Sequence, residues 1–434
     1  MNNATYKKLR IGEIVQTISL THKFDKDKLI AINTSDVYNG VMSKGTLTPV
    51  KELKGQFKKT IQKDDILFSE IRPANRRFAI VTNSDCSDFV VSTKLMVLRK
   101  FNEKVDSSYF YYCLTNQSFL YILQRRAENR IGSFPQITYD LLANYAFPIP
   151  PLEEQKRISK IIANIDRKIE LNRQINDNLE AMAKQLYDYW FVQFDFPNEE
   201  GKPYKSSGGA MVWNDKLKRE IPQGWHCGTL LDIAEYTNGL ACQKYRPTDN
   251  NKLPVIKIKE MHDGLSADTE WVKADIPDDV KVFDGDVLFS WSASLEVMLW
   301  AYGNGGLNQH IFKVTSKNGY PRSFYFYQLI HYVGVFKQMA EARKTTMGHI
   351  TQDHLRQSTI ALPPNVDITN KLEEKLCPIF DEIVKNNQEI MALTKQRDEL
   401  LPLLMNGQAS VNYHLSSFPH RSFGHSFAPK STRL

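Results

Sequence analysis

The chain contains an internal repeat with a period of about 214 residues, and this feature limits its possible folds more than any other. Several short segments recur in the same order, at shifts of 213 to 221 positions, and Gly12 also pairs with Gly228. Such a collinear set indicates a duplicated unit, so the 434 residues are expected to form two similar halves. The matched segments are 65–69 with 286–290, 108–114 with 323–329, 137–140 with 350–353, and 150–151 with 363–364.

Each copy of the repeat is expected to hold a mixed α/β part followed by a long helix. Short β-rich runs such as 78–81 and 90–98 are separated by Gly, Asn and Asp. Aromatic amphipathic helices are predicted at 107–126 in the first copy and at 323–343 in the second. A pair of prolines then precedes the long helix of each copy, and proline is favoured at a helix start.

The two long helices carry a heptad pattern of mostly apolar residues, and the pattern is in register between the copies. It predicts a coiled coil, although two separate amphipathic helices on globular domains remain an alternative. If the helices pair antiparallel, the duplication produces an approximate two-fold axis within one chain. The predicted seam contains Ile158, Ile162, Ile165, Ile169, Asn172, Asn176, Leu179, Leu186, Leu372, Leu376, Ile379, Ile383, Asn386, Ile390, Leu393 and Leu400.

Polar residues interrupt this seam near its middle, where Asn172, Asn176 and Asn386 stand. A buried asparagine lowers the stability of a coiled coil but can fix its register. The three could equally be tolerated polar substitutions. Pro402 is expected to end or kink the second helix near Leu401, because proline cannot donate a backbone hydrogen bond.

These patterns predict an α+β fold in which two mixed α/β domains are separated by two long helices. The helices are expected to form an antiparallel coiled coil, and the whole chain to have an internal pseudo-two-fold repeat. The predicted boundaries are 1–150 for the first domain, 151–194 for the first helical region, 195–225 for a linker, 226–362 for the second domain, 363–405 for the second helical region, and 406–434 for a disordered tail.

Charge is unevenly distributed along the chain. Residues 1–150 contain 22 Lys and Arg against 14 Asp and Glu, whereas residues 201–360 contain 19 against 17. The basic first block suggests a polyanionic partner such as nucleic acid. A lysine-rich surface that only increases solubility is the alternative.

Cysteine usage and hydropathy point to a soluble cytoplasmic protein without a membrane partner. The five cysteines are scattered and contain no C-x-x-C pair, which argues against a disulfide framework or a structural zinc site. No apolar run approaches the roughly 18 residues that a membrane span needs. The first ten residues lack the apolar stretch of a signal peptide.

No catalytic motif was found in the sequence. Phosphate-binding, dinucleotide-binding and amino-methyltransferase motifs are absent. The segment 277–281 has a weak likeness to a nuclease carboxylate–lysine set, but its counterpart in the first copy has nothing similar. His349 and His354 have no third ligand nearby in the sequence, so no metal site is expected. The chain is therefore predicted to bind rather than to catalyse.

Three segments carry a resemblance to a known family. Pro150-Pro151-Leu152-Glu153-Glu154-Gln155 opens the first long helix, and the stretches 190–197 and 201–209 follow that helix. These motifs, together with the two-copy layout, resemble the specificity (S) subunit of type I restriction–modification enzymes over nearly the whole chain.

The resemblance implies a non-catalytic subunit that reads a bipartite, gapped sequence in double-stranded DNA. Each mixed domain would be a target-recognition domain for one half-site, and the paired helices would dock two methyltransferase (M) subunits. Restriction (R) subunits would join the complex to translocate and cleave DNA. S-adenosylmethionine, ATP and Mg²⁺ would be used by those partners, and this chain would bind no cofactor itself.

Candidate DNA-binding residues lie in polar and basic loops of both copies. Arg and Asn side chains suit bidentate contacts with guanine and adenine edges, whereas exposed loop residues can also touch only phosphate or nothing. The candidates in the first copy are Ser69, Arg72, Asn75, Arg76, Arg77, Arg130, Gly132, Ser133 and Gln136. Those in the second copy are Gln243, Lys244, Tyr245, Arg246, Ser290, Trp291, Ser292, Ser294, Lys344, Thr345, Thr346 and His349.

Two other functions remain open at this point. The chain could be an orphan DNA-binding scaffold of the same fold without active partners, or one domain could hide a nuclease. Purified chain that cleaves DNA with a metal ion would favour the nuclease. The DNA target and its gap length are not encoded in any simple correspondence between loop residues and bases.

Overall fold

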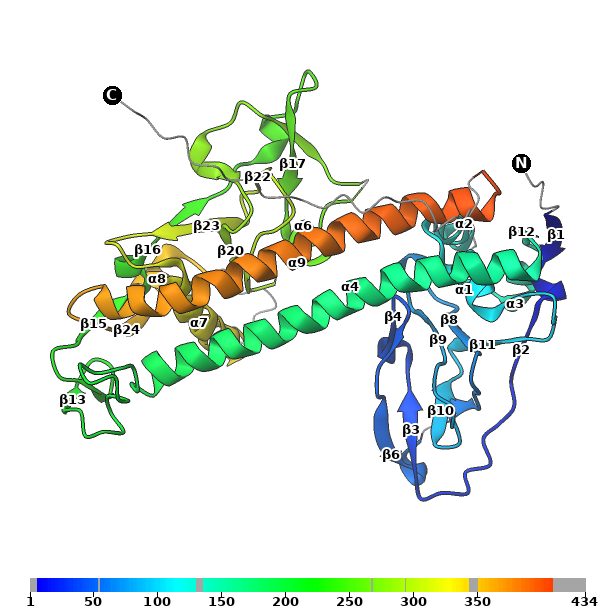
Figure 1. Ribbon diagram of the computed structural model, residues 1–434, viewed down its shortest axis with the longest axis horizontal. Coiled ribbons are helices and arrows are strands. Elements are labelled where there is room, and N and C mark those ends of the chain that lie inside the picture. The colour runs from blue at the N-terminus through cyan, green and yellow to red at the C-terminus, as the bar shows by residue number, and fades with distance from the viewer. Residues whose placement is uncertain are drawn as a thin grey trace, which may run out of the picture. The chain divides into compact units, whose positions relative to one another are not determined.

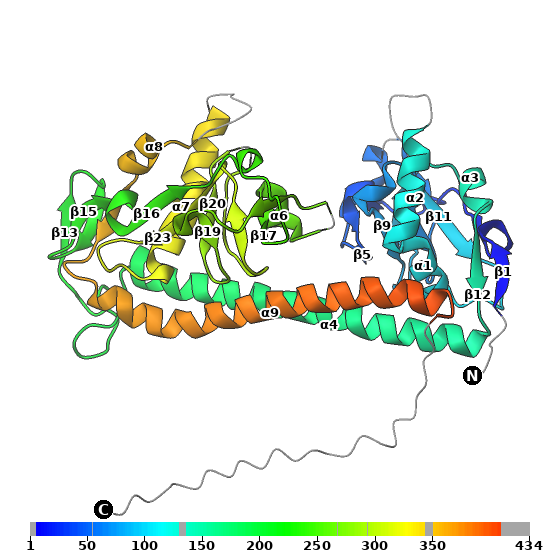
Figure 2. The same cartoon turned by 90° about the horizontal axis from the view of Figure 1, so that it is seen from above.

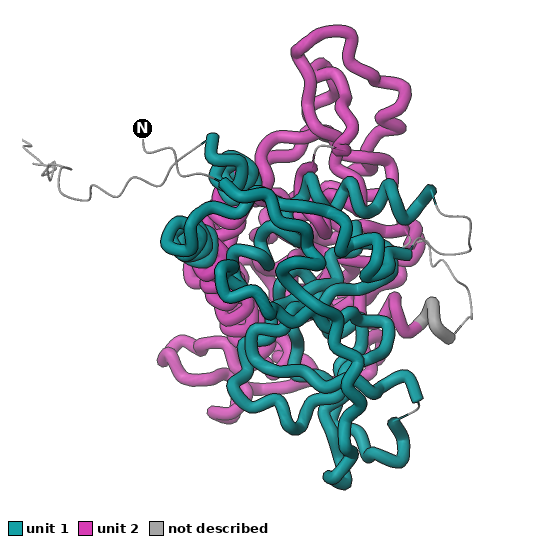
Figure 3. Tube along the Cα trace, turned by 90° about the vertical axis from the view of Figure 1, so that its right-hand side faces the viewer, with its two compact units in different colours: residues 1–164, 396–434 teal, residues 165–395 magenta. Residues whose placement is uncertain are grey.

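The computed structural model describes residues 6–53, 55–129, 136–266, 268–292, 294–342 and 350–408. These residues form two compact units (Figure 3): unit 1 contains residues 1–164 and 396–434, and unit 2 contains residues 165–395. The chain passes between the units within two long helices, so each helix contributes one part to each unit.

Unit 1 contains two four-stranded sheets and a two-stranded ribbon (Figure 1). The first sheet has the order β6-β3-β10-β7, and the second has the order β2-β11-β8-β9. A ribbon of β1 and β12 joins the start of the unit to the segment before the long helix. The strands are β1 (Lys7–Arg10), β2 (Val15–Thr17), β3 (Lys28–Ile32), β6 (Thr46–Pro49), β7 (Phe57–Lys59), β8 (Ile66–Ser69), β9 (Phe78–Ile80), β10 (Phe89–Ser92), β11 (Leu95–Lys100) and β12 (Ala146–Ile149), with a short hairpin of β4 (Val37–Tyr38) and β5 (Val41–Met42).

Unit 2 repeats the strand order of the two four-stranded sheets and of the ribbon. Its sheets have the orders β18-β17-β22-β19 and β16-β23-β20-β21, and its ribbon pairs β15 with β24. A parallel strand pairing recurs at the equivalent place in each unit, between β3 and β10 and between β17 and β22. The strands are β15 (His226–Thr229), β16 (Ala234–Asn238), β17 (Lys252–Ile256), β18 (Trp271–Lys273), β19 (Lys281–Val282), β20 (Val287–Ser290), β21 (Glu296–Leu299), β22 (Gly305–Leu307), β23 (Ile311–Ser316) and β24 (Thr359–Leu362). The predicted duplication is therefore confirmed.

One predicted match within the repeat is wrong. The short helix η1 (Ile11–Glu13) of unit 1 corresponds to α5 (Leu230–Ile233) of unit 2, a shift of 219 rather than 216. The carboxylate three residues into each element accepts a hydrogen bond from the backbone that precedes it, from Arg10 N to Glu13 and from Thr229 N to Asp232. Gly12 therefore does not correspond to Gly228, because loops of different length change the shift along the chain.

The aromatic helix after the sheets differs between the units. The predicted helix 107–126 is broken into α1 (Ser107–Thr115) and α2 (Gln117–Glu128), because the Asn116 side chain accepts a hydrogen bond from Phe119 N and caps a new helix. The second unit keeps one helix, α7 (Arg322–Ala342). A short helix follows in each unit: α3 (Tyr139–Ala143) in the first and α8 (Gln352–Gln357) in the second.

The two long helices are α4 (Leu152–Tyr187), extended by a π-helical turn η5 (Asp188–Val192), and α9 (Asp367–Met405). They lie side by side in both views (Figures 1 and 2). In unit 1 the beginning of α4, through Ile158 and Ile162, shares a core with Leu401 and Leu404 at the end of α9. In unit 2 Asn176 of α4 meets Asn386 of α9. The helices therefore run antiparallel, as expected.

Every residue of the predicted seam is buried or half-buried. Asn172, Asn176 and Asn386 are among the buried ones, and each has a polar partner across the helix pair. Asn386 Nδ2 donates to Asn176 Oδ1 at 2.9 Å, and Asn172 Nδ2 donates to Glu389 Oε2 at 2.7 Å. These asparagines are satisfied members of the interface, which fits the register-setting alternative better than accidental substitution.

Pro402 does not end the second helix. Helix α9 continues to Met405, and Gly407 with φ of 69° ends it. Gln408 N donates to Leu403 O at 2.9 Å and Gly407 N to Leu404 O at 3.3 Å, the pair of bonds that defines a Schellman motif. Proline at 402 removes only one helical hydrogen bond near the end, so one more turn is tolerated.

The segment 195–225, expected to be a linker, is folded. It contains the hairpin of β13 (Met211–Asn214) and β14 (Arg219–Pro222), and Ile221 and Trp225 are buried in the core of unit 2. Asp195 accepts hydrogen bonds from the backbone and the hydroxyl of Ser206, at 2.7 and 2.6 Å. The predicted tail after residue 408 lies outside the described residues.

Candidate DNA-recognition loops

Three loops of unit 1 meet at Glu70, directly after strand β8. Glu70 N donates to Lys94 O at 3.3 Å, in the turn before β11. Glu70 O accepts from Ile137 N at 2.7 Å, in the segment before α3. The loop after residue 69 and the loop that ends at residue 136 were predicted as separate candidates, and the structure brings them together at this residue.

Unit 2 contains the same three-loop junction around Trp291. Trp291 N donates to His310 O at 3.3 Å, and Trp291 O accepts from Ile350 N at 3.1 Å. The loops after β20, before β23 and before α8 therefore meet as their counterparts do in unit 1. We call this arrangement the loop junction, centred on Glu70 in unit 1 and on Trp291 in unit 2.

A side-chain cap completes the similarity of the two junctions. The Ser92 hydroxyl accepts a hydrogen bond from Lys94 N at 3.3 Å, and the Asn308 carbonyl oxygen accepts one from His310 N at 3.4 Å. In unit 1 the Lys59 ammonium also donates to Thr93 O at 3.0 Å and Leu95 O at 2.7 Å. Burial lowers the pKa of Lys59, because desolvation disfavours its charged form.

Two of the candidate serines are buried and form hydrogen bonds with the backbone of these loops. Ser69 and Ser290 are 4% and 0% exposed, at the ends of β8 and β20. The Ser69 hydroxyl donates to Ile71 O at 3.2 Å, and the Ser290 hydroxyl accepts from Glu296 N at 3.1 Å. Their burial contradicts the prediction that these side chains face a ligand, since loop hydrogen bonds hold both of them in the interior.

The basic loop of unit 1 surrounds a short helical turn, η4 (Pro73–Asn75). Arg72 and Arg76 on either side of the turn have positive φ angles of 47° and 53°, which are unfavourable for residues with a Cβ. The turn is tied to helix α2 through Ala74 N, which donates to Gln124 Oε1 at 3.1 Å. Such local strain is frequent in binding loops.

The side chains of this loop differ in whether they form hydrogen bonds within the protein. Arg76 Nη1 donates to Asn39 Oδ1 at 3.3 Å, and Arg77 Nη1 donates to Ser35 O at 3.2 Å while its guanidinium lies over the Tyr38 ring. Arg72 and Asn75 are exposed, and among the described residues their side chains make no hydrogen bond or ion pair. Arg72 and Asn75 are therefore the candidates of this loop that are best placed for a ligand.

The remaining candidates are distributed as follows. Gln136 is exposed and its Nε2 donates to Glu70 Oε2 at 2.9 Å. In unit 2 Ser292 is buried and Ser294 half-buried, and the Trp291 indole donates to Asn238 Oδ1 at 3.0 Å. Seven candidates lie outside the described residues: Arg130, Gly132, Ser133, Lys344, Thr345, Thr346 and His349.

The segment 243–246 belongs to a different part of unit 2. Tyr245 packs against the small core around Val255 and Val272, while Gln243, Lys244 and Arg246 are exposed. The preceding residue Leu240 is bonded to the loop before β23, since Gln309 N donates to Leu240 O at 2.8 Å. The segment therefore begins beside the Trp291 junction and continues along the other sheet.

Sequence reasoning missed Glu70, Lys94 and His310. The signal that could have found them is positional: residues 92–95 and 308–311 precede equivalent strands and share a capping side chain followed by a polar residue. Their sequences, Ser-Thr-Lys-Leu and Asn-Gln-His-Ile, have no identical position. Only the hydrogen-bond pattern makes the correspondence visible.

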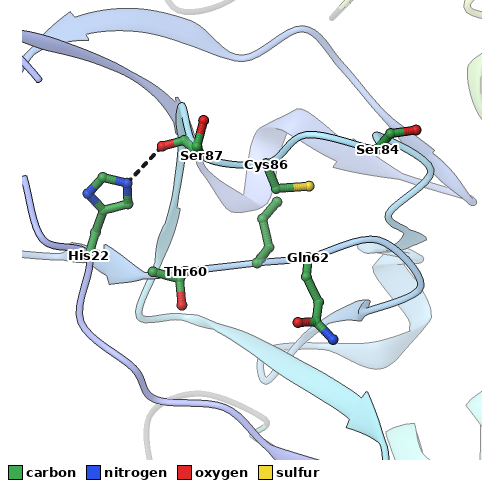
Figure 4. Close-up of a pocket in the computed structure, with 7 residues that line it drawn as sticks. His22, Thr60, Gln62, Ser84, Cys86 and Ser87 are labelled. Carbon is green, nitrogen blue, oxygen red and sulfur yellow. Dashed lines mark hydrogen bonds between the residues drawn. The ribbon is translucent and has the colours of Figure 1, made fainter.

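A cavity of about 220 Å³ in unit 1 is lined by His22, Thr60, Ile61, Gln62, Ser84, Cys86 and Ser87 (Figure 4). The buried His22 ring accepts from Phe24 N through Nδ1 at 2.9 Å, so its Nε2 donates to Ser87 O at 3.0 Å. Burial raises the pKa of the Cys86 thiol, which makes it a poor nucleophile. The geometry is that of a structural contact between loops.

Two further kinds of feature are absent from the described part of the chain. No group of three or more His, Cys, Asp or Glu side chains in that part of the chain is placed to hold a metal ion. None of the helices described is both long and apolar enough to cross a membrane. In the segment 277–281 the Lys281 ammonium forms an ion pair with Asp278 at 2.7 Å. The His354 ring accepts a hydrogen bond from Thr351 N at 3.1 Å at the start of α8.

Comparisons with known proteins agree on one family. The family model described as type I restriction modification DNA specificity domain matches residues 3–181 and again residues 222–396. The specificity subunit of the type I restriction enzyme HindI from Haemophilus influenzae is 28% identical, over 93% of this chain and 99% of the relative. The MjaIX specificity subunit from Methanocaldococcus jannaschii is 27% identical, over 71% of this chain and 70% of the relative.

A solved structure supports the fold. The S subunit of a type I restriction–modification system from M. genitalium matches with a TM-score of 0.52 at 13% identity, over 93% of this chain and 97% of that one. The two family matches coincide with the two copies of the repeat, and each copy carries one loop junction. The chain therefore belongs to the family of type I restriction–modification specificity subunits, which are DNA-recognition subunits, and it contains two target-recognition domains.

Proposed function

We propose that this chain reads a bipartite, gapped sequence in double-stranded DNA, with one target-recognition domain for each half-site. The observation that carries this proposal is the duplicated loop junction. Two units of the same topology present the same backbone arrangement with different side chains, Glu70 and Lys94 in one and Trp291 and His310 in the other. A shared framework with different side chains is what a reader of two different half-sites requires.

The two half-sites combine their affinities because the readers are linked in one chain. When two binding modules are connected, the second binding event takes place at a high effective concentration. Helices α4 and α9 provide this connection, and they would set the gap between the two half-sites. The satisfied polar pairs between Asn176 and Asn386 and between Asn172 and Glu389 hold the two helices in one register.

The partners in this proposal are two methyltransferase (M) subunits and restriction (R) subunits. Exposed apolar side chains on the helices offer contact area to them, among them Leu171 and Met182 of α4, which are 53% and 58% exposed. The M subunits would use S-adenosylmethionine, and the R subunits ATP and Mg²⁺. The chain itself would act as a non-catalytic subunit that brings DNA to them.

Mapping of adenine methylation in the source strain tests the proposal. The map is compared between cells with the gene intact and cells with the gene deleted. A gapped, two-part motif that loses its methyl groups on deletion is the expected result. Identical maps, with no motif that depends on the gene, would contradict the proposal, and re-expression of the intact gene is the control for effects on neighbouring genes.

A further inference from the structure

The connection between β3 and β6 in unit 1 contains a hairpin that the sequence analysis did not identify. Strands β4 and β5 are joined by the two-residue turn Asn39-Gly40, in which both residues have positive φ angles, 46° and 96°. Asn-Gly is favoured in such tight turns because both positions require positive φ. The described part of the equivalent connection in unit 2 contains instead a short helix, α6 (Ile258–Asp263). The two units therefore carry different elements at the same place of one framework.

The hairpin has one buried face and one exposed face. Val37 pairs with Met42, and both side chains pack in or against a small core of unit 1. Tyr38 pairs with Val41, and these side chains are 53% and 52% exposed. Side chains alternate between the two faces of a strand, so this pair lies on the outer face of the ribbon. Among the described residues the Tyr38 hydroxyl has no hydrogen-bond partner.

The basic loop after β8 is attached to this hairpin. Asn39 N donates to Arg76 O at 2.7 Å, and Arg76 Nη1 donates back to Asn39 Oδ1 at 3.3 Å. The Arg77 guanidinium lies 5.3 Å from the centre of the Tyr38 ring. Strand β5 lies beside β9, which follows the loop (Figure 2). Hairpin and loop therefore form one surface, which we call the basic ribbon surface and which consists of Tyr38, Val41, Arg72, Arg76 and Arg77.

The positive charge of the basic ribbon surface is not neutralised within the described part of the chain. None of its three arginines forms an ion pair there, whereas Arg99 of the same unit pairs with Asp65 at 2.7 Å. The nearby Asp36 carboxylate accepts from Asn33 N at 2.8 Å and from the Ser43 hydroxyl at 3.3 Å. Guanidinium groups stay charged at all ordinary pH values and bind phosphate oxygens well. The surface is therefore complementary in charge to a polyanion.

We propose that the basic ribbon surface is where unit 1 meets double-stranded DNA, with the β4–β5 ribbon in the major groove and the three arginines on the flanking phosphates. The inference rests on the proposed function, since the polyanion is the DNA that the chain is proposed to read. It adds Tyr38 and Val41 as residues that face the base edges.

The shape and chemistry of the ribbon fit this place. The major groove of B-DNA is wide enough for a two-stranded ribbon, and the thymine methyl group is an apolar feature there. An exposed valine and the edge of a tyrosine ring suit such a contact, while the tyrosine hydroxyl can donate to or accept from a base or a phosphate. Arginines beside the ribbon would fix its depth and direction without reading sequence.

The salt dependence of binding tests the role of the arginines. The affinity of the purified chain for a random-sequence DNA duplex is measured between low and physiological salt. Combined Arg72→Ala, Arg76→Ala and Arg77→Ala should reduce the slope of log affinity against log salt by roughly 2.7, because each phosphate contact contributes about 0.9. The corresponding triple lysine variant keeps the charges and should keep the slope, which separates loss of charge from loss of the fold.

A matched control removes the same charge elsewhere in unit 1. Lys7, Lys8 and Arg10 of β1 are exposed and lie on the other side of the unit from β5 and β9 (Figure 2). Their combined replacement by alanine should leave the slope unchanged. An equal reduction in both alanine variants would overturn the inference, because the effect would then come from net charge and not from this surface.

Selection of DNA duplexes from a randomised pool tests the position of the ribbon. Tyr38→Ala should reduce the base preference in one half-site by at least roughly fivefold, the lower end for one base contact, and leave the other half-site unchanged. Phe101→Ala, which removes another exposed aromatic side chain of unit 1, should leave the selected motif as in the wild type.

The outcomes separate this inference from the proposed function. A bipartite wild-type motif, with a slope that the arginine variant does not change, would overturn the inference and leave the proposed function intact. A reduced slope with an unchanged motif in Tyr38→Ala would overturn the placement of the ribbon in the groove. A wild-type chain that binds DNA without selecting any motif would contradict the proposed function, while the slope would still test the arginines.

Discussion

The two units share one topology but stabilise equivalent places by different means. In unit 1 Asp65, just before β8, is almost fully buried and forms a bidentate salt bridge with Arg99. The Nε–Oδ1 and Nη2–Oδ2 distances are 2.8 and 2.7 Å. In unit 2 the equivalent carboxylate, Asp286, is partly exposed and pairs with Lys313 at 2.9 Å. The duplicated framework therefore accommodates ion pairs of different burial and geometry at equivalent places.

The largest effect is expected from neutralising the buried carboxylate of unit 1. Asp65→Asn leaves the Arg99 guanidinium without its charged partner and should cost unit 1 about 3 kcal/mol, whereas Asp286→Asn should cost unit 2 roughly 1.5 kcal/mol. Hydrogen exchange of the amides in β8 and β20 measures this, since about 3 kcal/mol corresponds to a roughly 100-fold loss of protection. Equal losses of protection in both units would show that the burial of the carboxylate does not determine the cost of neutralising it.

A smaller effect is expected at the break between α1 and α2. Asn116→Ala removes the side-chain cap on Phe119 N and should cost the first turn of α2 about 1 kcal/mol. Asn116→Asp retains an acceptor at the same place and serves as the matched control. Exchange of the Phe119 amide reports the result, and unchanged protection in the alanine variant would mean that packing alone positions α2.

The smallest effect concerns the polar pairs between the two long helices in unit 2. Hydrogen bonds from Lys168 and Asn172 lower the pKa of Glu389. Because its pKa is lower in the folded state than in the unfolded state, its stabilisation is present above the unfolded pKa and is lost as pH falls through the folded value.

Glu389→Gln should remove this part of the pH dependence. Protection of the α4 and α9 amides in unit 2 is compared for wild type and variant between roughly pH 6 and pH 3, around the ordinary glutamate pKa. The two proteins should differ above the folded pKa of Glu389 and converge below it. Glu382→Gln, which breaks a pair with Lys385 within one helix, is the control, and a constant difference at all pH values would contradict the prediction.

Much of the architecture was predictable because it depends on patterns that are local in the sequence. The heptad of Ile158 and Ile162 marks a helix face, and the proline pair marks the start of α4 closely, since the helix begins at Leu152. Pro402 was expected to end or kink α9 near Leu401, but the helix continues to Met405, the last residue of the predicted helical region. A left-handed glycine that makes two capping bonds ends a helix more effectively than a proline near its end.

The candidate site was predicted only in part. The sequence pointed to the loop after β8 because Arg72 and Asn75 follow a β-rich run, and both side chains are exposed. It also included Ser69 and Ser290, which are buried, because a polar residue at the end of a strand looks the same whether it faces solvent or the interior. The proposed DNA contacts of the loop residues stay predictions.

The sequence by itself determined the duplication, the two long helices and their seam, since repeats and periodicity are properties of residue order. Only the tertiary structure decided which loops meet after β8 and β20, and that Glu70 and Trp291 occupy the same place. The physical reason is that these features depend on hydrogen bonds between segments far apart in the chain. Residues 70, 94 and 137 become neighbours only after the sheets have formed, and no local sequence pattern predicts these contacts.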